Sequence, residues 1–253
     1  MTQFSDKEMM AISAGRLVQD GDVLFAGTGI SMLAATVAKR IHAPGATVFF
    51  ETGGIDPSLE ELPLAVADPR VMVGTCLNSG LLDAFSLLVH RRLRTIAFLG
   101  AAQIDPYGNL NSTLLGDFER PRVRFPGCGG ACDAAAQAFG VIIFMQHQKR
   151  RFVPKLDYRS SVGWLEGGDS RRRAGMKRGG PMAVVTNLGV LKFEAQSKTM
   201  YLDQCHPGVT PEQVQENTGF ELDISRAGQA QPPSEQELDI LRREVDPQRL
   251  ILG

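Results

Sequence analysis

The fold class is decided by the stretch VLFAGTGISMLAATVAKRI, residues 23–41. Its first four residues form a short apolar run, which is typical of a buried strand. Gly27 and Gly29 supply the turn that follows, and from residue 31 the apolar side chains recur with helical spacing, with Leu33, Val37 and Ile41 on one face. A strand that turns directly into a helix is the building unit of α/β domains, so the stretch predicts that class.

The flanking sequence continues the alternation of strands and helices. A helix is expected from Ser5, where Glu8 completes a capping box, to the break at Gly21-Asp22. Further strands are expected at residues 47–50, 71–74 and 96–99, with a helix over residues 81–92 between the last two. This order predicts a mostly parallel sheet with helices packed against it.

After Gly100 the sequence becomes rich in proline and glycine. It still predicts a helix over residues 131–138, a strand over 141–145, and a final helix over 234–244. Two apolar runs flank Asn187-Leu188-Gly189 and predict a hairpin there. The polar segment 163–181, with Arg171 to Arg178, is expected to be a solvated loop. We therefore predict a single α/β domain over residues 1–253, with a loop-rich and more antiparallel second half.

Composition excludes several classes of protein. The 253 residues carry 27 Lys plus Arg and 28 Asp plus Glu, a net charge of −1, and 43% are hydrophobic, so the chain is globular and should not capture nucleic acid electrostatically. No apolar run is long enough for a membrane span and no signal-peptide core is present, which predicts a cytoplasmic protein without membrane partners. The four cysteines lack the paired spacing of a zinc site, so no metal is expected.

Standard catalytic motifs are missing. The Gly27-Thr28-Gly29 turn lacks the third glycine of a dinucleotide fingerprint, because Met32 stands in its place. There is no phosphate-binding loop of the Walker type, no nucleophile elbow and no HExxH. The four histidines are scattered and are expected to be surface or core residues, and no base is visible beside the cysteines.

Three segments carry candidate chemistry. Glu51 follows the apolar run Val48-Phe49-Phe50 and precedes Gly53 and Gly54, so its carboxylate is either a partly desolvated nucleophile or the partner of an arginine or a helix cap. The loop at Gly127, Gly129 and Gly130 opens the alanine-rich helix. Its backbone N–H groups could stabilise an oxyanion or a phosphate, or the glycines could serve only a tight connection.

The third segment is Lys149-Arg150-Arg151, which follows a strand. Its cations are either a phosphate site or a solvated turn. No aromatic residues alternate with these cations, as they would in a site for single-stranded nucleic acid. All of these alternatives stay open on the residues alone.

Long collinear stretches resemble one known family. They are residues 100–109 (GAAQIDPYGN), residues 145–152 and residues 216–220 (ENTGF), together with the Glu51 and Gly127 loops in the same order. Along nearly the whole chain the sequence resembles the beta (B) subunits of the family I CoA-transferases, of the glutaconate CoA-transferase type. The resemblance implies an open α/β sandwich, and an active site where alpha and beta subunits meet in a heterodimer or higher heteromer.

The resemblance also implies a reaction. In this family the glutamate of an E-[SN]-G motif, matched here by Glu51-Thr52-Gly53, attacks an acyl-CoA and becomes a glutamyl-CoA thioester that passes CoA to a second carboxylic acid. Coenzyme A would then be a substrate, with no permanently bound cofactor. Gly53, Gly54 and the Gly127 loop would hold the oxyanion, the acyl group or CoA, and Lys149 to Arg151 the CoA phosphates.

The resemblance favours dicarboxylic or branched acyl groups over 3-oxoacids. Threonine replaces serine or asparagine at residue 52, which could reshape the acyl pocket. Relatives of the fold that lack the glutamate are decarboxylases or ring-opening hydrolases. Hydrolysis or decarboxylation of a CoA ester is therefore the alternative, and a non-catalytic subunit that only shapes a partner's pocket is another.

Overall fold

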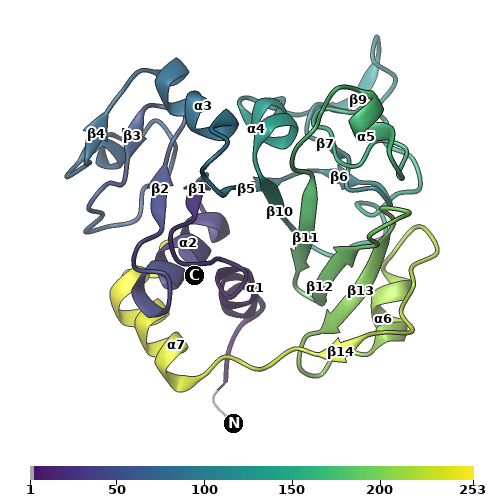
Figure 1. Cartoon of the computed structure of the whole chain (residues 1–253). Coiled ribbons are helices and arrows are strands. Elements are labelled where there is room, and N and C mark those ends of the chain that lie inside the picture. The colour runs from purple at the N-terminus through teal and green to yellow at the C-terminus, as the bar shows by residue number, and fades with distance from the viewer. Residues whose placement is uncertain (1–2) are drawn as a thin grey trace. The chain divides into compact units, whose positions relative to one another are not determined.

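The computed structural model describes residues 3–253, which form two compact units. The first contains the chain up to Leu99 together with Pro232–Gly253, and the second contains Gly100–Gln231 (Figure 1). The prediction of a single domain stays a prediction. The α/β class, with parallel and antiparallel strands, is confirmed.

The first unit contains five strands, four helices and two short helical turns among the described residues. In chain order they are α1 (Asp6–Gly15), β1 (Val23–Phe25), α2 (Ile30–Ile41), β2 (Thr47–Phe49), β3 (Gly54–Ile55), η1 (Pro69–Met72), β4 (Leu77–Asn78), α3 (Leu81–Val89), β5 (Thr95–Gly100), α7 (Glu235–Ile240) and η2 (Leu241–Val245). The strands run in the order β5-β1-β2-β3-β4, and β1 is parallel to both β5 and β2. The β2–β3 and β3–β4 pairs are antiparallel.

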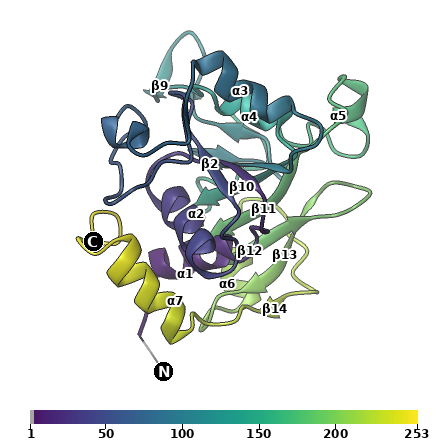
Figure 2. The same ribbon diagram turned by 60° about the vertical axis from the view of Figure 1, so that its left-hand side comes forward.

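The helices of this unit pack as the sequence pattern predicts. Ser5 and Glu8 form the expected capping box, although α1 ends at Gly15, before the Gly21-Asp22 break. Figures 1 and 2 show α1, α2 and the C-terminal α7 side by side, and α2 contacts both of the others. Arg242 donates to the buried carboxylate of Glu8 at 2.6 Å, so the C-terminal segment is tied to α1.

The prediction of a strand over residues 71–74 is wrong. This segment contains a 3₁₀ turn over Pro69–Met72. The side chain of Asp68 accepts a hydrogen bond from the Arg70 N–H, and proline follows as the first residue of the turn. An N-cap aspartate followed by proline favours a helical start, and here it outweighs the short apolar run.

The second unit contains the remaining elements. They are β6 (Gln103–Ile104), β7 (Leu110–Asn111), β8 (Leu114–Gly116), β9 (Pro121–Arg124), α4 (Ala131–Gln137), β10 (Gly140–Met145), α5 (Ser170–Arg173), β11 (Pro181–Thr186), β12 (Gly189–Phe193), β13 (Met200–Cys205), α6 (Pro211–Glu216) and β14 (Gly228–Gln229). Five of these strands pair in the order β10-β11-β12-β13-β14. The predicted hairpin is confirmed: β11 and β12 are antiparallel, with Val184 opposite Leu191.

A buried polar network organises the loops of this unit. Asn109 is fully buried, donates to Asp105 and to the Leu165 carbonyl, and accepts from the N–H groups of Gly163 and Leu165. Burial raises the pKa of Asp105, and the hydrogen bonds from Asn109 oppose that rise. The stretch 100–109 therefore has a structural role. No helix in residues 3–253 is long and apolar enough to cross a membrane.

Candidate functional site

Glu51 lies in the tight turn that joins β2 to β3. The Gly53 N–H donates to the Phe50 carbonyl at 3.0 Å, and the Phe50 N–H donates to the Gly54 carbonyl at 3.0 Å. Phe49 and Phe50 are fully buried, whereas Glu51 is half-buried. The apolar strand end therefore anchors the turn in the core, while Glu51 itself stays partly exposed.

The two glycines after Glu51 allow close packing of backbone. Gly53 has a φ of +104°, and a Cβ there would lie 1.9 Å from the Ser79 carbonyl oxygen. At Gly54 a Cβ would lie 2.2 Å from the Val71 carbonyl oxygen. No side chain fits at either position, so these glycines hold the Glu51 turn against its neighbours. Because the Gly53 N–H is used within the turn, it is not free to bind an oxyanion.

Ser79 fixes the turn from the other side. Its backbone N–H donates to the Gly53 carbonyl at 2.9 Å, and its hydroxyl donates to the same oxygen at 3.1 Å. Ser79 was not among the predicted site residues, because it lies 26 residues after Gly53 and has no local motif around it. The available signal was its position two residues before the helix that begins at Leu81.

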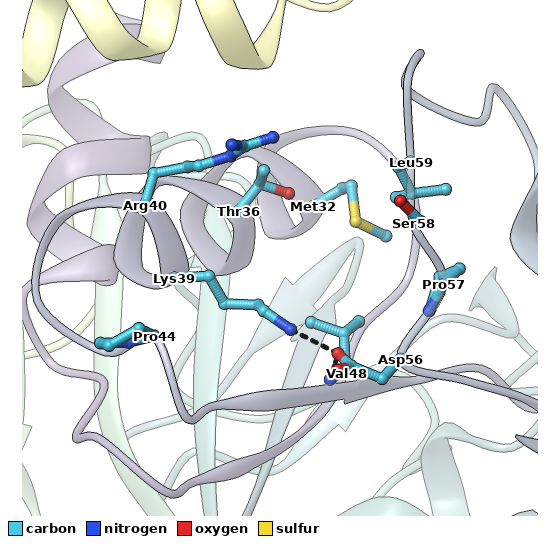
Figure 3. Close-up of a pocket in the computed structure, with 10 residues that line it drawn as sticks. All are labelled: Met32, Thr36, Lys39, Arg40, Pro44, Val48, Asp56, Pro57, Ser58 and Leu59. Carbon is cyan, nitrogen blue, oxygen red and sulfur yellow. Dashed lines mark hydrogen bonds and ion pairs between the residues drawn. The ribbon is translucent and has the colours of Figure 1, made fainter. Parts of the chain in front are cut away.

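A cavity of about 390 Å³ lies between α2 and the β2–β3 segment (Figure 3). Figure 3 shows the Lys39 ammonium group at the Asp56 carboxylate, with which it forms an ion pair. Val48 of β2 lines the cavity, but Glu51 does not. This cavity is therefore not formed around Glu51, and its lysine is already neutralised.

The predicted glycine loop of the second unit has a defined backbone. Gly127 has a φ of +103° and its N–H donates to the Ser112 carbonyl at 3.1 Å. Within residues 3–253, the N–H groups of Cys128 and Gly129 make no hydrogen bond. Gly130 is the residue that precedes α4. Cys128 and Gly129 are thus the positions where this loop can offer backbone donors to an anion.

Cys132, at the start of α4, is a poor nucleophile. Burial, the neighbouring Cys128 and the carboxylate of Asp133 together raise the pKa of Cys132 to about 11. A thiol with such a pKa is almost fully protonated at neutral pH, and the thiolate is the reactive form. In the described part of the chain, no group of three or more His, Cys, Asp or Glu side chains is arranged to hold a metal ion.

Lys149, Arg150 and Arg151 lie in a turn after β10. Lys149 and Arg150 are exposed, and the Nε atoms of both arginines donate to the Gln148 side-chain oxygen, at 3.0 Å and 3.3 Å. None of the three cations forms an ion pair with a described carboxylate. Their charge is therefore available to an anionic ligand, and a role in binding CoA phosphate stays a prediction.

His147 is a core residue, as expected. Its Nδ1 lies 3.2 Å from the Thr186 hydroxyl, its Nε2 lies 3.0 Å from the Thr218 hydroxyl, and its ring stacks on Phe152. Burial lowers the pKa of His147 to about 3, so the imidazole is neutral. Thr218 belongs to the stretch 216–220 and His147 to the stretch 145–152, so these two stretches are joined by a buried hydrogen bond.

The prediction that Arg171 lies in a solvated loop is wrong. Arg171 is only 2% exposed, and its guanidinium donates hydrogen bonds to the carbonyls of Gly163, Ala135 and Ala136. Burial lowers the pKa of Arg171 to about 10. The residue binds the C-terminal carbonyls of α4, where a cation also complements the helix dipole. Arg172, the next residue, is exposed as expected.

Comparison with known proteins identifies close relatives. The family model described as Coenzyme A transferase matches residues 7–217, across both units. The B subunit of glutaconate CoA-transferase from Acidaminococcus fermentans is 42% identical over 251 residues, covering 97% of this chain and 94% of that protein. The B subunit of 3-oxoadipate CoA-transferase from Pseudomonas knackmussii is 37% identical over 245 residues, covering 96% and 94%.

A solved structure agrees with these relatives. The crystal structure of glutaconate coenzyme A-transferase from Acidaminococcus fermentans matches with a TM-score of 0.96 and 40% identity. The match covers all of this chain and 98% of the other. Together the comparisons confirm the family resemblance found in the sequence.

Proposed function

Because this chain belongs to the coenzyme A transferase family, we propose that Glu51 is the residue that carries CoA during the transfer reaction. Both named relatives are the B subunit of a CoA-transferase, and this chain is one subunit of a heteromeric enzyme of that kind. The partner is a homologous alpha subunit, in a heterodimer or higher heteromer. The observation that supports the role of Glu51 most strongly is its place in a rigid turn at the end of a buried strand.

The proposed reaction has two halves. The Glu51 carboxylate attacks the thioester carbonyl of the donor acyl-CoA and forms an acyl-glutamyl anhydride, while CoA leaves as the thiolate. The thiolate attacks the glutamyl carbonyl, gives the glutamyl-CoA thioester and releases the donor acid. The acceptor carboxylate then attacks the thioester, and CoA returns through a second anhydride to form the new acyl-CoA and free Glu51.

The structure of the turn supports this role for physical reasons. A nucleophile must be held within a fraction of an ångström of its reacting position, because small misplacements cost large factors in rate. The fully buried Phe49 and Phe50, together with the Gly53–Ser79 hydrogen bonds, give the turn that rigidity. We propose that Gly53 and Gly54 act by positioning Glu51 rather than by direct binding.

The other candidate residues have supporting roles in the proposal. The Gly127–Gly130 loop, through the N–H groups of Cys128 and Gly129, would stabilise the tetrahedral oxyanions, and loss of one such donor typically costs ~10²–10³-fold in rate. Lys149, Arg150 and Arg151 would bind CoA phosphates. Coenzyme A is a substrate of the family, and we propose that no cofactor is permanently bound and that the enzyme is cytoplasmic.

The acyl groups are proposed to be dicarboxylic. Glutaconate and 3-oxoadipate, the acids in the names of the two relatives, each carry two carboxylates. The second is also a 3-oxoacid, so the preference against 3-oxoacids suggested by the sequence is not kept. A terminal carboxylate on the substrate would require a cation in the acyl pocket, which either subunit could supply.

The test is the kinetics of Glu51→Gln in the assembled enzyme, with glutaconyl-CoA as donor and 3-oxoadipate as acceptor. Glu51→Gln removes the nucleophile at nearly constant shape, and we expect transfer to fall by at least ~10³-fold. Glu60→Gln is the matched control, because Glu60 is an exposed carboxylate of the same unit and should change nothing. Near-normal transfer by Glu51→Gln would exclude the covalent route.

Product analysis separates the alternative reactions. Free CoA without a new acyl-CoA would indicate hydrolysis, and released CO₂ would indicate decarboxylation. Transfer that does not change in a Glu51 variant would indicate a subunit that only shapes the pocket of its partner. Transfer through Glu51 requires a new acyl-CoA, formed in equal amount to the donor consumed.

A further inference from the structure

Positive side chains gather around one cavity of the second unit. The cavity, of about 270 Å³, is lined by Trp164, by the segment that contains α5, and by the loop that joins β12 to β13. We call it the Trp164 pocket. Among the described residues its charged lining consists of the carboxylate Asp169 and the cations Arg171, Arg172, Lys177, Arg178 and Lys198. The whole chain has a net charge of −1, so this excess of positive charge is local.

Hydrogen bonds fix the backbone around the Trp164 pocket. The Gly168 N–H donates to the Ser197 carbonyl at 2.9 Å, which joins the two segments that form the pocket and that lie beside one another in Figure 2. The indole N–H of Trp164 donates to the Pro181 carbonyl at 3.0 Å, and the Trp164 carbonyl accepts from the Ser170 hydroxyl at 2.8 Å. The walls are therefore held in place by the chain itself, which lowers the entropic cost of binding a ligand.

Arg171 places a buried positive charge at this pocket. Its guanidinium donates to the Arg178 carbonyl at 3.2 Å, so it also closes the basic segment 171–178 on itself. Carbonyl oxygens accept its hydrogen bonds, but no described carboxylate forms an ion pair with it. The pKa of about 10 leaves the group charged at neutral pH. A buried charge without a counter-ion favours an anion bound nearby.

Two lysines reach the pocket from separate segments. Lys177 follows α5, and Lys198 belongs to the β12–β13 loop, where its Nζ lies 4.5 Å from the centre of the Trp164 ring. Neither lysine forms an ion pair with a described carboxylate. The carboxylate of the lining, Asp169, pairs instead with two arginines of α5. The charges of both ammonium groups are therefore available to a ligand.

The charge and the size of the Trp164 pocket indicate the class of ligand. Arginine and lysine side chains that converge on one place are typical of sites for phosphate groups. Pockets for drug-sized molecules are typically about 300–1,000 Å³, so a volume of about 270 Å³ fits a small charged group rather than a whole nucleotide. A carboxylate has a single charge, whereas a diphosphate has several and can span cations from two segments. The lining therefore matches a diphosphate, with the rest of the ligand outside the pocket.

We propose that the Trp164 pocket binds the diphosphate group of a phosphorylated metabolite. Its oxygens accept hydrogen bonds from Lys177 and Lys198 and lie beside the buried charge of Arg171. The cations of the 149–151 turn do not line this pocket, so it is a second place for an anion. Two sources share this chemistry: the diphosphate of CoA and the diphosphate of a free nucleotide. The proposal does not rest on the role of Glu51.

The test is the binding of inorganic pyrophosphate to the purified full chain, measured by isothermal titration calorimetry and by tryptophan fluorescence. Trp164 is the only tryptophan of the sequence, so its emission reports on this pocket. We expect a Kd below ~1 mM that rises with ionic strength, because salt screens the exposed ammonium groups. Because Lys198 lies over the indole ring, the emission should change over the same range of pyrophosphate concentration.

The decisive variant combines Lys177→Gln with Lys198→Gln, which removes both available charges. We expect the Kd for pyrophosphate to rise by ~10-fold or more. Neither lysine is buried, so the circular dichroism spectrum should stay that of the wild type. The matched control is Lys155→Gln, because Lys155 is an exposed lysine of the same unit that does not line the pocket. This control should bind pyrophosphate with the wild-type Kd.

Three results would overturn the proposal. The first is a wild-type chain that does not bind pyrophosphate below ~1 mM. The second is an unchanged Kd in the double variant. The third is binding that Arg150→Gln abolishes and the double variant keeps, because pyrophosphate would then occupy the 149–151 turn.

Steady-state kinetics of the assembled enzyme identify the source of the diphosphate. If the source is CoA, the double variant should raise the KM for glutaconyl-CoA along with the Kd for pyrophosphate, and pyrophosphate should compete with glutaconyl-CoA. If the source is a free nucleotide, adenosine diphosphate should displace pyrophosphate while the KM of the double variant stays that of the wild type. Either result supports the pocket. Glu51→Gln should bind pyrophosphate with the wild-type Kd, so the pocket and the covalent route stand or fall separately.

Discussion

Replacing Gly53 by alanine should displace the Glu51 turn. The added Cβ would lie 1.9 Å from the Ser79 carbonyl oxygen, and ordinary contact begins near 3.4 Å, so the two backbones must separate by about 1.5 Å. The positive φ of +104° adds strain of ~1–2 kcal/mol for any residue with a side chain. Separation also weakens two hydrogen bonds from Ser79, at ~1 kcal/mol each.

The expected destabilisation is therefore ~2–4 kcal/mol, measured as the free energy of unfolding in urea. Transfer activity should fall further than stability alone explains, because a shift of about 1 Å in a reacting group costs ~10²-fold in rate. The matched control is Gly21→Ala, where φ is +81° and no atom lies within 4 Å of the new Cβ. This variant should show the strain alone, ~1–2 kcal/mol, and keep its kcat.

Both quantities are measured on the same preparations: urea unfolding of the isolated chain, and steady-state transfer by the enzyme assembled with its alpha subunit at saturating donor. A Gly53→Ala enzyme with normal kcat, or one no less stable than Gly21→Ala, would refute the reasoning. The first result would mean that the turn does not position the nucleophile. The second would mean that the Gly53–Ser79 contact carries no free energy.

Three further predictions concern buried and titratable groups. Burial opposes ionisation of Glu8, but hydrogen bonds from Arg242 and Ser5 lower its pKa. Glu8→Gln should therefore lower the free energy of unfolding by ~1.5–3 kcal/mol at pH 7. In urea titrations the difference in unfolding free energy between this variant and the wild type should shrink as pH falls below about 4.3. Arg171→Met leaves the α4 carbonyls without their donor and should lower the free energy of unfolding by ~2–4 kcal/mol. The exposed control Arg172→Met should change this free energy by less than ~0.5 kcal/mol. Equal effects of the two variants would contradict the structural role of buried Arg171. Alkylation of Cys132 by iodoacetamide should be slow at pH 8 and accelerate toward pH 11, followed by peptide mass spectrometry; fast labelling at pH 7 would contradict the raised pKa.

Local sequence signals located most of the fold. The strand, glycine turn and helix of residues 23–41 are confirmed because each depends on neighbours a few residues away. The Ser5–Glu8 capping box and the 187–189 hairpin are confirmed for the same reason. The strand at residues 71–74 was wrong although a local signal, Asp68-Pro69, was available to correct it.

The features that fix the site are not local. Ser79 holds Gly53 across 26 residues, and Arg171 reaches the end of α4 across 35, so neither contact has a motif around it. The exposure of Leu82 is equally invisible in sequence, because an apolar helix such as α3 reads as core. Glu51 itself could be singled out, since a carboxylate at the end of an apolar strand before two glycines is a local pattern.

The central claim, that Glu51 carries CoA, is tested most directly by trapping the intermediate. The assembled enzyme is mixed with glutaconyl-CoA in the absence of an acceptor, quenched in acid and digested, and the peptide that contains Glu51 is weighed by mass spectrometry. We predict a gain in mass equal to CoA less one water, located at Glu51, lost on treatment with hydroxylamine and absent from Glu51→Gln. An enzyme that transfers CoA between acids yet shows no adduct, or shows it on another residue, would contradict this role of Glu51.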